Sequence, residues 1–253
     1  MIHETAIISS EATIGRNVEI GPYCVINAGV TIGDGCKLHS HVVIDGLTTI
    51  GQECEFFPFS AIGGKTQDLK YDGEPTSLVI GDRNVFRENT TIHRSTDKEI
   101  PTKIGHDNLF LSYSHVAHDC QVGNHTIFSN NGTIAGHVIV EDYAIISGLA
   151  GVHQFCRVGA HSIVGGCTKI VQDVPPFMIV DGTPAAVRGF NSVGMQRRGF
   201  TDEQVKEVKK AYKALFLKKD KNLADALEGL SDASGLTAVV RDYVAASERG
   251  VTR

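Results

Sequence analysis

Four histidines that could act as bases lie near one another in the middle of the chain: His115, His118, His137 and His153. A neutral imidazole with a pKa of about 6.5 can accept a proton at neutral pH. Asp119 directly follows His118 and could orient its ring and stabilise the protonated form. The sequence has no Gly-x-Ser-x-Gly motif and no candidate catalytic Cys–His pair, so a general base is favoured over a covalent intermediate.

A six-residue repeat predicts the scaffold that must position these side chains. Of 28 positions taken every six residues from Ile8 to Ile170, 25 carry a large aliphatic residue or Phe, and the exceptions are Asp68, Glu74 and Lys98. Each hexapeptide predicts one short strand and one corner, so three hexapeptides complete one coil. Stacked coils would pair their backbones about 4.8 Å apart. The sequence therefore predicts a mainly β, triangular solenoid.

The 18-residue period of three hexapeptides also predicts which residues stack on one another. His118, Gly136 and Gln154 fall in one column, and Asp119 falls beneath His137 in the next column. Gly136 would let a ligand approach the backbone closely, and its N–H is a candidate oxyanion donor. We therefore expect a polar, chemically active cluster on an otherwise aliphatic scaffold.

Small residues usually stand two positions before the aliphatic one, and five of the six cysteines belong to this column. These cysteines are expected to face the core rather than to react or bind metal. No Cys-x-x-Cys pair is present, which argues against a structural zinc site of that type. No metal and no cofactor are predicted. The column cysteines are Cys24, Cys36, Cys54, Cys120 and Cys156.

Charge and hydropathy exclude several classes of protein. A net charge of −5 argues against a general nucleic-acid partner. The N-terminal segment has no basic or apolar region typical of a signal peptide, and no apolar stretch approaches the roughly 18 residues of a membrane span. We therefore expect a cytoplasmic protein with no stable membrane insertion.

The repeat is interrupted at 64–78 and 95–102, where the sequence is polar and rich in turn residues. Loops that interrupt a solenoid project from one face and often form its binding site. The repeat stops after residues 174–176, and the pattern becomes helical from a capping box at 201–204. We predict two domains: a β-helix over 1–186 and an α-helical C-terminal domain over 187–253.

Three helical segments are expected in the tail, around 205–216, 223–230 and 239–244. The first carries a run of lysines in an otherwise acidic protein. This run is either an ordinary solvated face or a docking surface for an acidic partner. The lysines are Lys206, Lys209, Lys210, Lys213, Lys218 and Lys219.

Nine short motifs together resemble the acyl-[acyl-carrier-protein]–UDP-N-acetylglucosamine O-acyltransferases, a hexapeptide-repeat family that begins lipid A synthesis. The resemblance implies a left-handed parallel β-helix, a homotrimer with active sites between subunits, and transfer of an (R)-3-hydroxyacyl chain from acyl-carrier protein to the 3-position of UDP-N-acetylglucosamine without an acyl-enzyme. The motifs are QDLKY (67–71), GEPT (73–76), IHR (92–94), VAHDC (116–120), AGH (135–137), VHQF (152–155), VGGC (164–167), QDVPP (172–176) and RRGF (197–200).

The same resemblance implies a role for each matching residue. His118 would be the general base, Asp119 its partner and Gly136 the oxyanion donor, while Gly166 would be an acyl-length ruler that leaves room for a long chain. Substrate would be bound at the insertion, around the histidines and, for the UDP portion, at Gly148, Asn191 and an arginine pair suited to a diphosphate. The implied substrate-binding residues are Gln67, Asp68, Lys70, His115, His137, Gly148, His153, Gln154, Asn191, Arg197 and Arg198.

Two departures from the family pattern lie near the expected nucleotide end. Residues 182–189 lack an Asn-His or Asn-Pro pair often seen in relatives, and Val193 stands where a better-known member has Glu. The uridine contacts are therefore the part of the site that this sequence defines least.

Three alternatives remain open from the sequence. The first is a related sugar N-acyltransferase with a 3-amino acceptor, although that sibling carries an N-terminal domain for which a repeat starting at Ile8 leaves no room. The second is a zinc-dependent hydratase of the same fold with three histidine ligands, and the third is a purely structural solenoid. His118 beside Asp119 and beneath Gly136 favours a base with a hydrogen-bond donor over a set of metal ligands.

Overall fold

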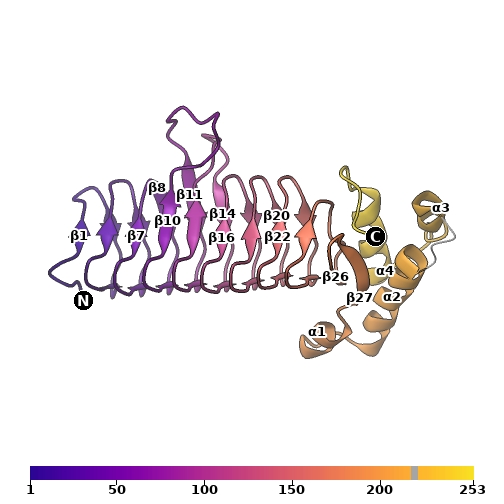
Figure 1. The fold of residues 1–253 in the computed structure, drawn as a ribbon. Coiled ribbons are helices and arrows are strands. Elements are labelled where there is room, and N and C mark those ends of the chain that lie inside the picture. Colours follow the sequence, from indigo (N-terminus) through magenta and orange to yellow (C-terminus); the bar gives the residue numbers. More distant parts are fainter. Residues whose placement is uncertain (218–221) are drawn as a thin grey trace.

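A computed structural model describes residues 1–217 and 222–253 of the chain. Figure 1 shows a long prism of stacked coils that carries a group of helices at its C-terminal end. The strands are two to five residues long, and each coil adds one strand to each of three sheets. The predicted triangular solenoid is therefore present.

The first and second sheets contain only parallel pairs and form two faces of the prism. In spatial order the first sheet contains β1 (Ile7–Ile8), β4 (Val25–Ile26), β7 (Val43–Ile44), β10 (Ala61–Gly64), β13 (Thr91–His93), β16 (His115–Val116), β19 (Thr133–Ile134), β22 (Gly151–Val152) and β25 (Lys169–Ile170). The second contains β2 (Thr13–Ile14), β5 (Thr31–Ile32), β8 (Leu47–Ile50), β11 (Ser77–Ile80), β14 (Thr102–Ile104), β17 (Gln121–Val122), β20 (Ile139–Val140) and β23 (Arg157–Val158).

The third sheet forms the remaining face, and its last pair, β26 with β27, is antiparallel. This reversal lets the chain leave the prism toward the helices. In spatial order the sheet contains β3 (Glu19–Ile20), β6 (Lys37–Leu38), β9 (Glu55–Phe56), β12 (Val85–Phe86), β15 (Leu109–Phe110), β18 (Ile127–Phe128), β21 (Ile145–Ile146), β24 (Ile163–Val164), β26 (Met178–Asp181) and β27 (Ala186–Phe190).

The strand register follows the predicted period of three hexapeptides, as in the pairing of Ile127 with Ile145. Two coils are longer than this period: the one that runs from Ala61 to its partner Thr91, and the one that runs from Thr91 to its partner His115. The extra residues leave the prism between a first-sheet strand and the following second-sheet strand, an edge that we call the first corner. Both predicted insertions therefore project from the same edge of the molecule (Figure 1).

The interior of the prism is filled by the large apolar residue of the six-residue repeat, which is the second residue in the two-residue strands, and by the small residue two positions before it. The five column cysteines are buried, as predicted, whereas Cys167 is exposed. Within the core, Phe56, Phe86, Phe110 and Phe128 stack with ring centroids 4.8 to 4.9 Å apart. Each coil thus buries its apolar residues only by lying against the next one.

The corners require unusual backbone geometry. In the described part of the chain, nineteen residues other than glycine have positive φ, Asp119 and His137 among them. Such angles are unfavourable for residues with a Cβ and persist where surrounding contacts hold them. Here the N–H of the residue with positive φ generally donates to a carbonyl in the preceding coil, as from His137 to His118 O at 3.1 Å. The stacked neighbours therefore fix the corners.

The C-terminal segment packs as a second apolar cluster against the end of the prism, and this cluster includes Phe177 and Met178. The predicted capping box is present: the Thr201 side chain accepts from the Gln204 N–H, and the Gln204 side chain accepts from the Thr201 N–H. The helices are α1 (Ser192–Arg197), α2 (Asp202–Tyr212), the π-helix η1 (Lys213–Leu217), α3 (Leu223–Glu228) and α4 (Gly235–Ala245).

The three predicted helical segments correspond to α2 with η1, to α3 and to α4, whereas the short helix α1 was not predicted. Lys218 and Lys219 lie outside the described residues. In the described ranges no helix is long and apolar enough to cross a membrane. The division into two domains between residues 186 and 187 stays a prediction.

His93, at the end of β13, is buried beneath the insertions, with 8% of its surface exposed. Its Nδ1 has no hydrogen-bond partner among the described residues, and its ring contacts that of His115 edge to face. Burial, followed by the charges of His115, His118 and Arg94, lowers the pKa of His93 to about 4. This histidine is therefore held neutral in the folded protein.

Replacement of Gly81 by Ala tests how tightly the coils pack at a corner. A Cβ at Gly81 would lie 2.6 Å from the Gly105 carbonyl oxygen in the next coil, whereas a Cβ at Gly189 has nothing within 4 Å. We expect Gly81→Ala to destabilise the protein by about 2 kcal/mol, because the backbone must shift to relieve the overlap. Thermal unfolding should show a lower midpoint for Gly81→Ala and an unchanged one for Gly189→Ala. Equal midpoints would contradict this packing.

Acidification should destabilise the fold through His93. Since its folded pKa of about 4 lies below the unfolded value of about 6.5, the unfolded chain binds more protons between these values. The contribution of neutral His93 to the free energy of unfolding is fully present above about pH 6.5 and is lost as the pH falls toward about 4. The free energy of unfolding should decrease by on the order of 3 kcal/mol over this range. Chemical denaturation at several pH values should give a shallower pH dependence for His93→Gln than for the wild type. The exposed-site control His41→Gln should keep the wild-type slope, and equal slopes for all three would disprove the assignment.

Candidate active site

The chemically capable side chains are concentrated at the first corner. His115 lies on β16, and His118 with Asp119 occupies the turn that leads from β16 to β17. Gly136 and Gln154 occupy the equivalent turns of the next two coils. The solenoid thus brings the residues of the predicted column to one edge of the prism.

His118 lies directly beside Gly136. A Cβ on Gly136 would fall 2.5 Å from Cε1 and 2.7 Å from Nε2 of His118, so only glycine leaves this space to the ring. In the described part of the chain the Gly136 N–H has no hydrogen-bond acceptor. At the corner between the second and third sheets, the equivalent N–H groups of His106 and Asn124 are capped by side chains of the next coil. The Gly136 N–H is therefore a donor that the fold leaves unused.

Asp119 holds the imidazole of His118 from the other side. Its Oδ2 lies 2.6 Å from His118 Nδ1 and 3.6 Å from His137 Nε2. With the carboxylate ionised, Nδ1 carries the hydrogen and donates it to Asp119, which leaves the lone pair on Nε2. A histidine in this arrangement can accept a proton through Nε2.

The charge on Asp119 is stabilised although the side chain is only 8% exposed. Burial alone would raise the pKa of this carboxyl. Hydrogen bonds from His118 and from the backbone and side chain of Thr96, together with the nearby His137, lower the pKa by a larger amount. The net pKa is below the ordinary value. Asp119 is therefore ionised at neutral pH and can support a positive charge on His118.

The remaining predicted histidines surround this pair to different degrees. His137 contacts His118 edge to face at 5.3 Å and stacks on Phe155. His115 bonds Thr91 Oγ1 through Nδ1 at 2.7 Å, and its pKa is lowered by burial and then by the charge of His118. His153 and Gln154 are exposed one coil beyond His137. His118, Asp119 and His137 therefore contact one another, whereas His153 and Gln154 lie one coil farther along the same edge.

The first insertion carries its three predicted residues at the same corner, two coils before His118. Gln67 and Lys70 are exposed, and the Lys70 N–H donates to Asp68 Oδ1 at 2.9 Å. These three residues lie at the first corner, as expected, but no hydrogen bond links them to His118 in the described ranges.

Other predicted residues lie on different faces. Gly148 and Gly166 are stacked at the corner between the third and first sheets, and a Cβ on Gly166 would meet only the Gly148 carbonyl oxygen, at 3.4 Å. Packing therefore does not demand a glycine at 166. The absence of a side chain there keeps space free outside the prism.

The predicted nucleotide residues gather beside the third sheet. Arg197, Arg198 and Asn191 line a groove of about 400 Å³ that also includes Val193. Asn191 caps α1 by accepting from the Gly194 N–H. A row of outward isoleucines forms the floor of the groove: Ile127, Ile145, Ile163 and Ile179. One chain alone therefore does not bring the arginine pair to the first corner.

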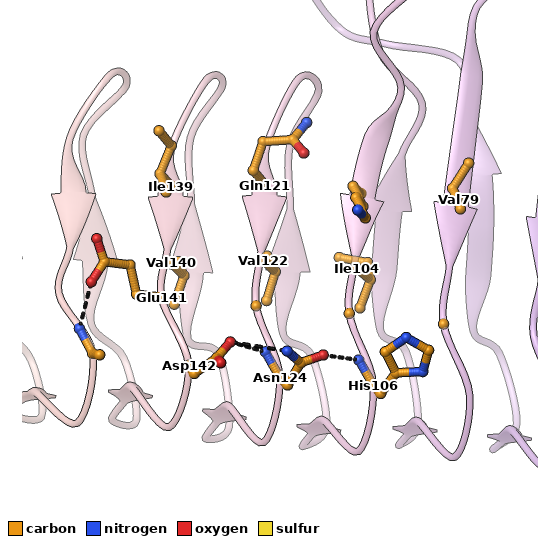
Figure 2. Close-up of a pocket in the computed structure, with 15 residues that line it drawn as sticks. Val79, Ile104, His106, Gln121, Val122, Asn124, Ile139, Val140, Glu141 and Asp142 are labelled. Atoms are coloured by element: carbon orange, nitrogen blue, oxygen red, sulfur yellow. Dashed lines mark hydrogen bonds between the residues drawn. The ribbon is translucent and has the colours of Figure 1, made fainter.

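A larger groove, of about 770 Å³, runs along the outer face of the second sheet and includes Lys103, Gln121 and Ile139 (Figure 2). At its edge the Asn124 side chain accepts from the His106 N–H, and Asp142 accepts from the Asn124 N–H. None of the predicted catalytic residues lines this groove, although β17 follows Asp119 directly. It is a surface adjacent to the first corner and was not predicted.

One group of described side chains could hold a metal ion: ligand atoms of His118, Asp119 and His137 lie within 4.8 Å of one another. The Asp119 oxygens already accept from His118 and from both donors of Thr96. This set also differs from the three histidines of the hydratase alternative. The expected absence of a metal stays a prediction.

Comparison with known proteins identifies the relatives of this chain. Residues 173–252 match the family model described as UDP-N-acetylglucosamine O-acyltransferase, domain 2, and residues 11–46 match the bacterial transferase hexapeptide model. An acyl-[acyl-carrier-protein]–UDP-N-acetylglucosamine O-acyltransferase of Thiobacillus denitrificans is 51% identical over 100% of this chain and 99% of its own.

Solved structures agree with the sequence relatives. A UDP-N-acetylglucosamine acyltransferase from Bacteroides fragilis is 39% identical with a TM-score of 0.96, and both chains are covered fully. The enzyme LpxA from Acinetobacter baumannii is 43% identical with a TM-score of 0.94, over 100% of this chain and 99% of that one. The predicted fold, a left-handed parallel β-helix followed by a small helical part, is confirmed. The chain belongs to the family of acyl-[acyl-carrier-protein]–UDP-N-acetylglucosamine O-acyltransferases.

Proposed function

We propose that this protein transfers a hydroxyacyl chain from acyl-carrier protein to the 3-position of UDP-N-acetylglucosamine, the first step of lipid A synthesis. The observation that carries the proposal is the His118–Asp119 pair beside the unpaired Gly136 N–H. The relative from Thiobacillus denitrificans, 51% identical over the whole chain, bears the name of this activity. Base, orienting carboxylate and backbone donor are the groups that direct acyl transfer needs.

His118 acts as the general base in this reaction. Its Nε2 removes the proton from the sugar 3-hydroxyl while the oxygen attacks the thioester carbonyl carbon. The protonated ring is stabilised by Asp119, whose Oδ2 lies 2.6 Å from Nδ1. As the C–S bond breaks, the same proton passes to the departing thiolate, so the enzyme ends the cycle unchanged.

Gly136 supplies the second element of the chemistry. The tetrahedral intermediate carries negative charge on the former carbonyl oxygen, and a fixed N–H stabilises that charge. The Gly136 N–H meets this need because the described residues offer it no acceptor. The absence of a Cβ at Gly136 also leaves room for the His118 ring beside this N–H.

The charged residues proposed to bind substrate lie in two places on the prism, at the first corner and beside the third sheet. Asp68 and Lys70 hold the amino sugar from the insertion, whereas Arg197 and Arg198 bind the diphosphate. Since the arginine pair lies beside the third sheet and the base lies at the first corner, a complete site needs a second copy of the chain. In line with the resemblance to the family, we infer that this assembly is a homotrimer with active sites between subunits, and that it acts in the cytoplasm.

A second acceptor is compatible with the same arrangement. A 3-amino nucleotide sugar would present a nitrogen in place of the 3-hydroxyl oxygen, and His118 would receive the proton that the nitrogen loses on acylation. No described residue at the first corner distinguishes the two acceptors. Transfer to both acceptors should therefore be compared directly.

Replacement of His118 by Ala should lower the rate of acyl transfer at least about 100-fold, because general-base catalysis contributes that much. The assay follows transfer from hydroxyacyl-carrier protein to UDP-N-acetylglucosamine and to its 3-amino analogue. His41→Ala, at an exposed corner in the N-terminal half, serves as the matched control and should keep wild-type activity. Retention of more than a few per cent of activity by His118→Ala, or stoichiometric zinc in the purified protein, would contradict the mechanism.

Gly166→Met should shift donor preference toward shorter acyl chains. The fold has room for a Cβ at this position, since the nearest atom would be 3.4 Å away, so the longer side chain would project into the space outside. We expect the ratio of kcat/KM for long to short donors to fall at least about tenfold, from lost apolar contact and overlap with the chain end. Gly189→Met provides a control outside the site. An unchanged ratio would remove Gly166 from the acyl site.

A further inference from the structure

The backbone around Asp119 differs from that of the first-corner turns in the two coils that follow it. In the two following coils the N–H of the equivalent residue donates to a carbonyl of the preceding coil, as His137 does to His118 and Phe155 does to Gly136. The coil before Asp119 carries the second insertion at this corner. The Asp119 N–H instead donates to the side chain of Thr102, at 2.8 Å. The insertion therefore takes the place of the first-corner turn that would otherwise lie beneath Asp119.

One residue of this insertion binds both oxygens of the Asp119 carboxylate. The Thr96 N–H donates to Oδ1 at 2.9 Å, and the Thr96 hydroxyl donates to Oδ2 at 2.8 Å. Oδ2 is the oxygen that also faces His118 Nδ1 at 2.6 Å. Two bonds from a single residue fix the carboxylate plane as well as its position. The direction of the His118 ring is therefore linked to Thr96 through Asp119.

The insertion keeps its shape through contacts that do not involve the Thr96 side chain. The Ser95 N–H donates to the Ser77 carbonyl, and the Ser95 hydroxyl donates to the Asp97 carbonyl. Asp97 Oδ1 accepts from the N–H groups of Glu99 and Ile100. Because these bonds hold the loop by themselves, the Thr96 hydroxyl is not needed for folding of the insertion.

We propose that Thr96 is a positioning residue for acyl transfer, acting on His118 through the plane and charge of the Asp119 carboxylate. This proposal rests on the proposed function. Thr96 itself touches neither the proposed base nor, by that scheme, the substrate. Its effect is to aim Nε2 of His118 at the hydroxyl that loses its proton, since small errors in orientation cost rate steeply.

The charges around Asp119 predict how the pH dependence should respond. The groups that face it are His118 and His137 from its own and the next coil, and Asp97 from the insertion. The Thr96 hydroxyl competes with His118 for charge on Oδ2. Its removal strengthens the bond to the imidazole, which favours the protonated ring. The acid limb of the pH–rate profile should therefore move to higher pH.

Thr96→Val tests this role because it removes the hydroxyl and keeps the side-chain shape and the N–H. We expect kcat on the pH plateau to fall about tenfold with an unchanged KM for UDP-N-acetylglucosamine. The acid limb of the kcat/KM profile should move upward, and Thr96→Ser should restore both. Thr31→Val, at an exposed position of β5, four coils before β17 in the second sheet, is the matched control.

A measurement without substrate separates this inference from the proposed function. Nitrogen-15 NMR of the labelled His118 ring should show an Nδ1 shift altered in the direction of a stronger Nδ1–H bond to Asp119 in Thr96→Val, and the wild-type shift in Thr96→Ser. If the wild type lacks acyltransferase activity, the proposed function fails and the NMR comparison still tests Thr96. If the wild type is active and Thr96→Val matches it in kcat, pH profile and ring shifts, or if Ser fails to restore them, the positioning role is wrong.

Discussion

Backbone pairing between successive coils is the constraint on which the rest of the structure depends. Each two-residue strand is too short to persist alone, and it is held by the strands of the coils above and below. Backbone hydrogen bonds between coils also hold corner residues such as His137 and Phe155 in the left-handed region of backbone space. The position of a residue within the coil therefore determines whether its side chain is buried in the core or exposed to solvent.

The candidate chemistry uses the corners because the faces are committed to strand pairing and the interior to packing. At the first corner one coil places His118, the next places Gly136 beside it, and an enlarged coil below supplies hydrogen bonds to Asp119. The imidazole is thus fixed from three levels of the prism. The stacking that makes the corner turns rigid therefore also holds the His118 ring in a fixed orientation.

Most of the fold was predictable because its signal is periodic. The aliphatic positions, the inward cysteines and the stacking of His118 with Gly136 all follow from one spacing, and the structure has each of them. Helix α1 was not predicted, since six residues carry little periodic signal. The links from Thr96 and Thr102 to Asp119 were also missed. These hydrogen bonds depend on the path of the second insertion. Because the sequence of that loop does not repeat, it does not predict where its hydroxyl groups lie.

The two enlarged coils show how this architecture can accept new sequence. Their extra residues leave and re-enter the prism at one corner, so the coils above and below still pair in register. A single residue added within a face would instead turn inward residues outward in that strand and disturb the stacking of His118 with Gly136. Tolerance to changes in length is therefore confined to the edges of the prism. A solenoid of this kind can therefore gain residues beside its proposed base without disturbing the strand pairing that holds the base in place.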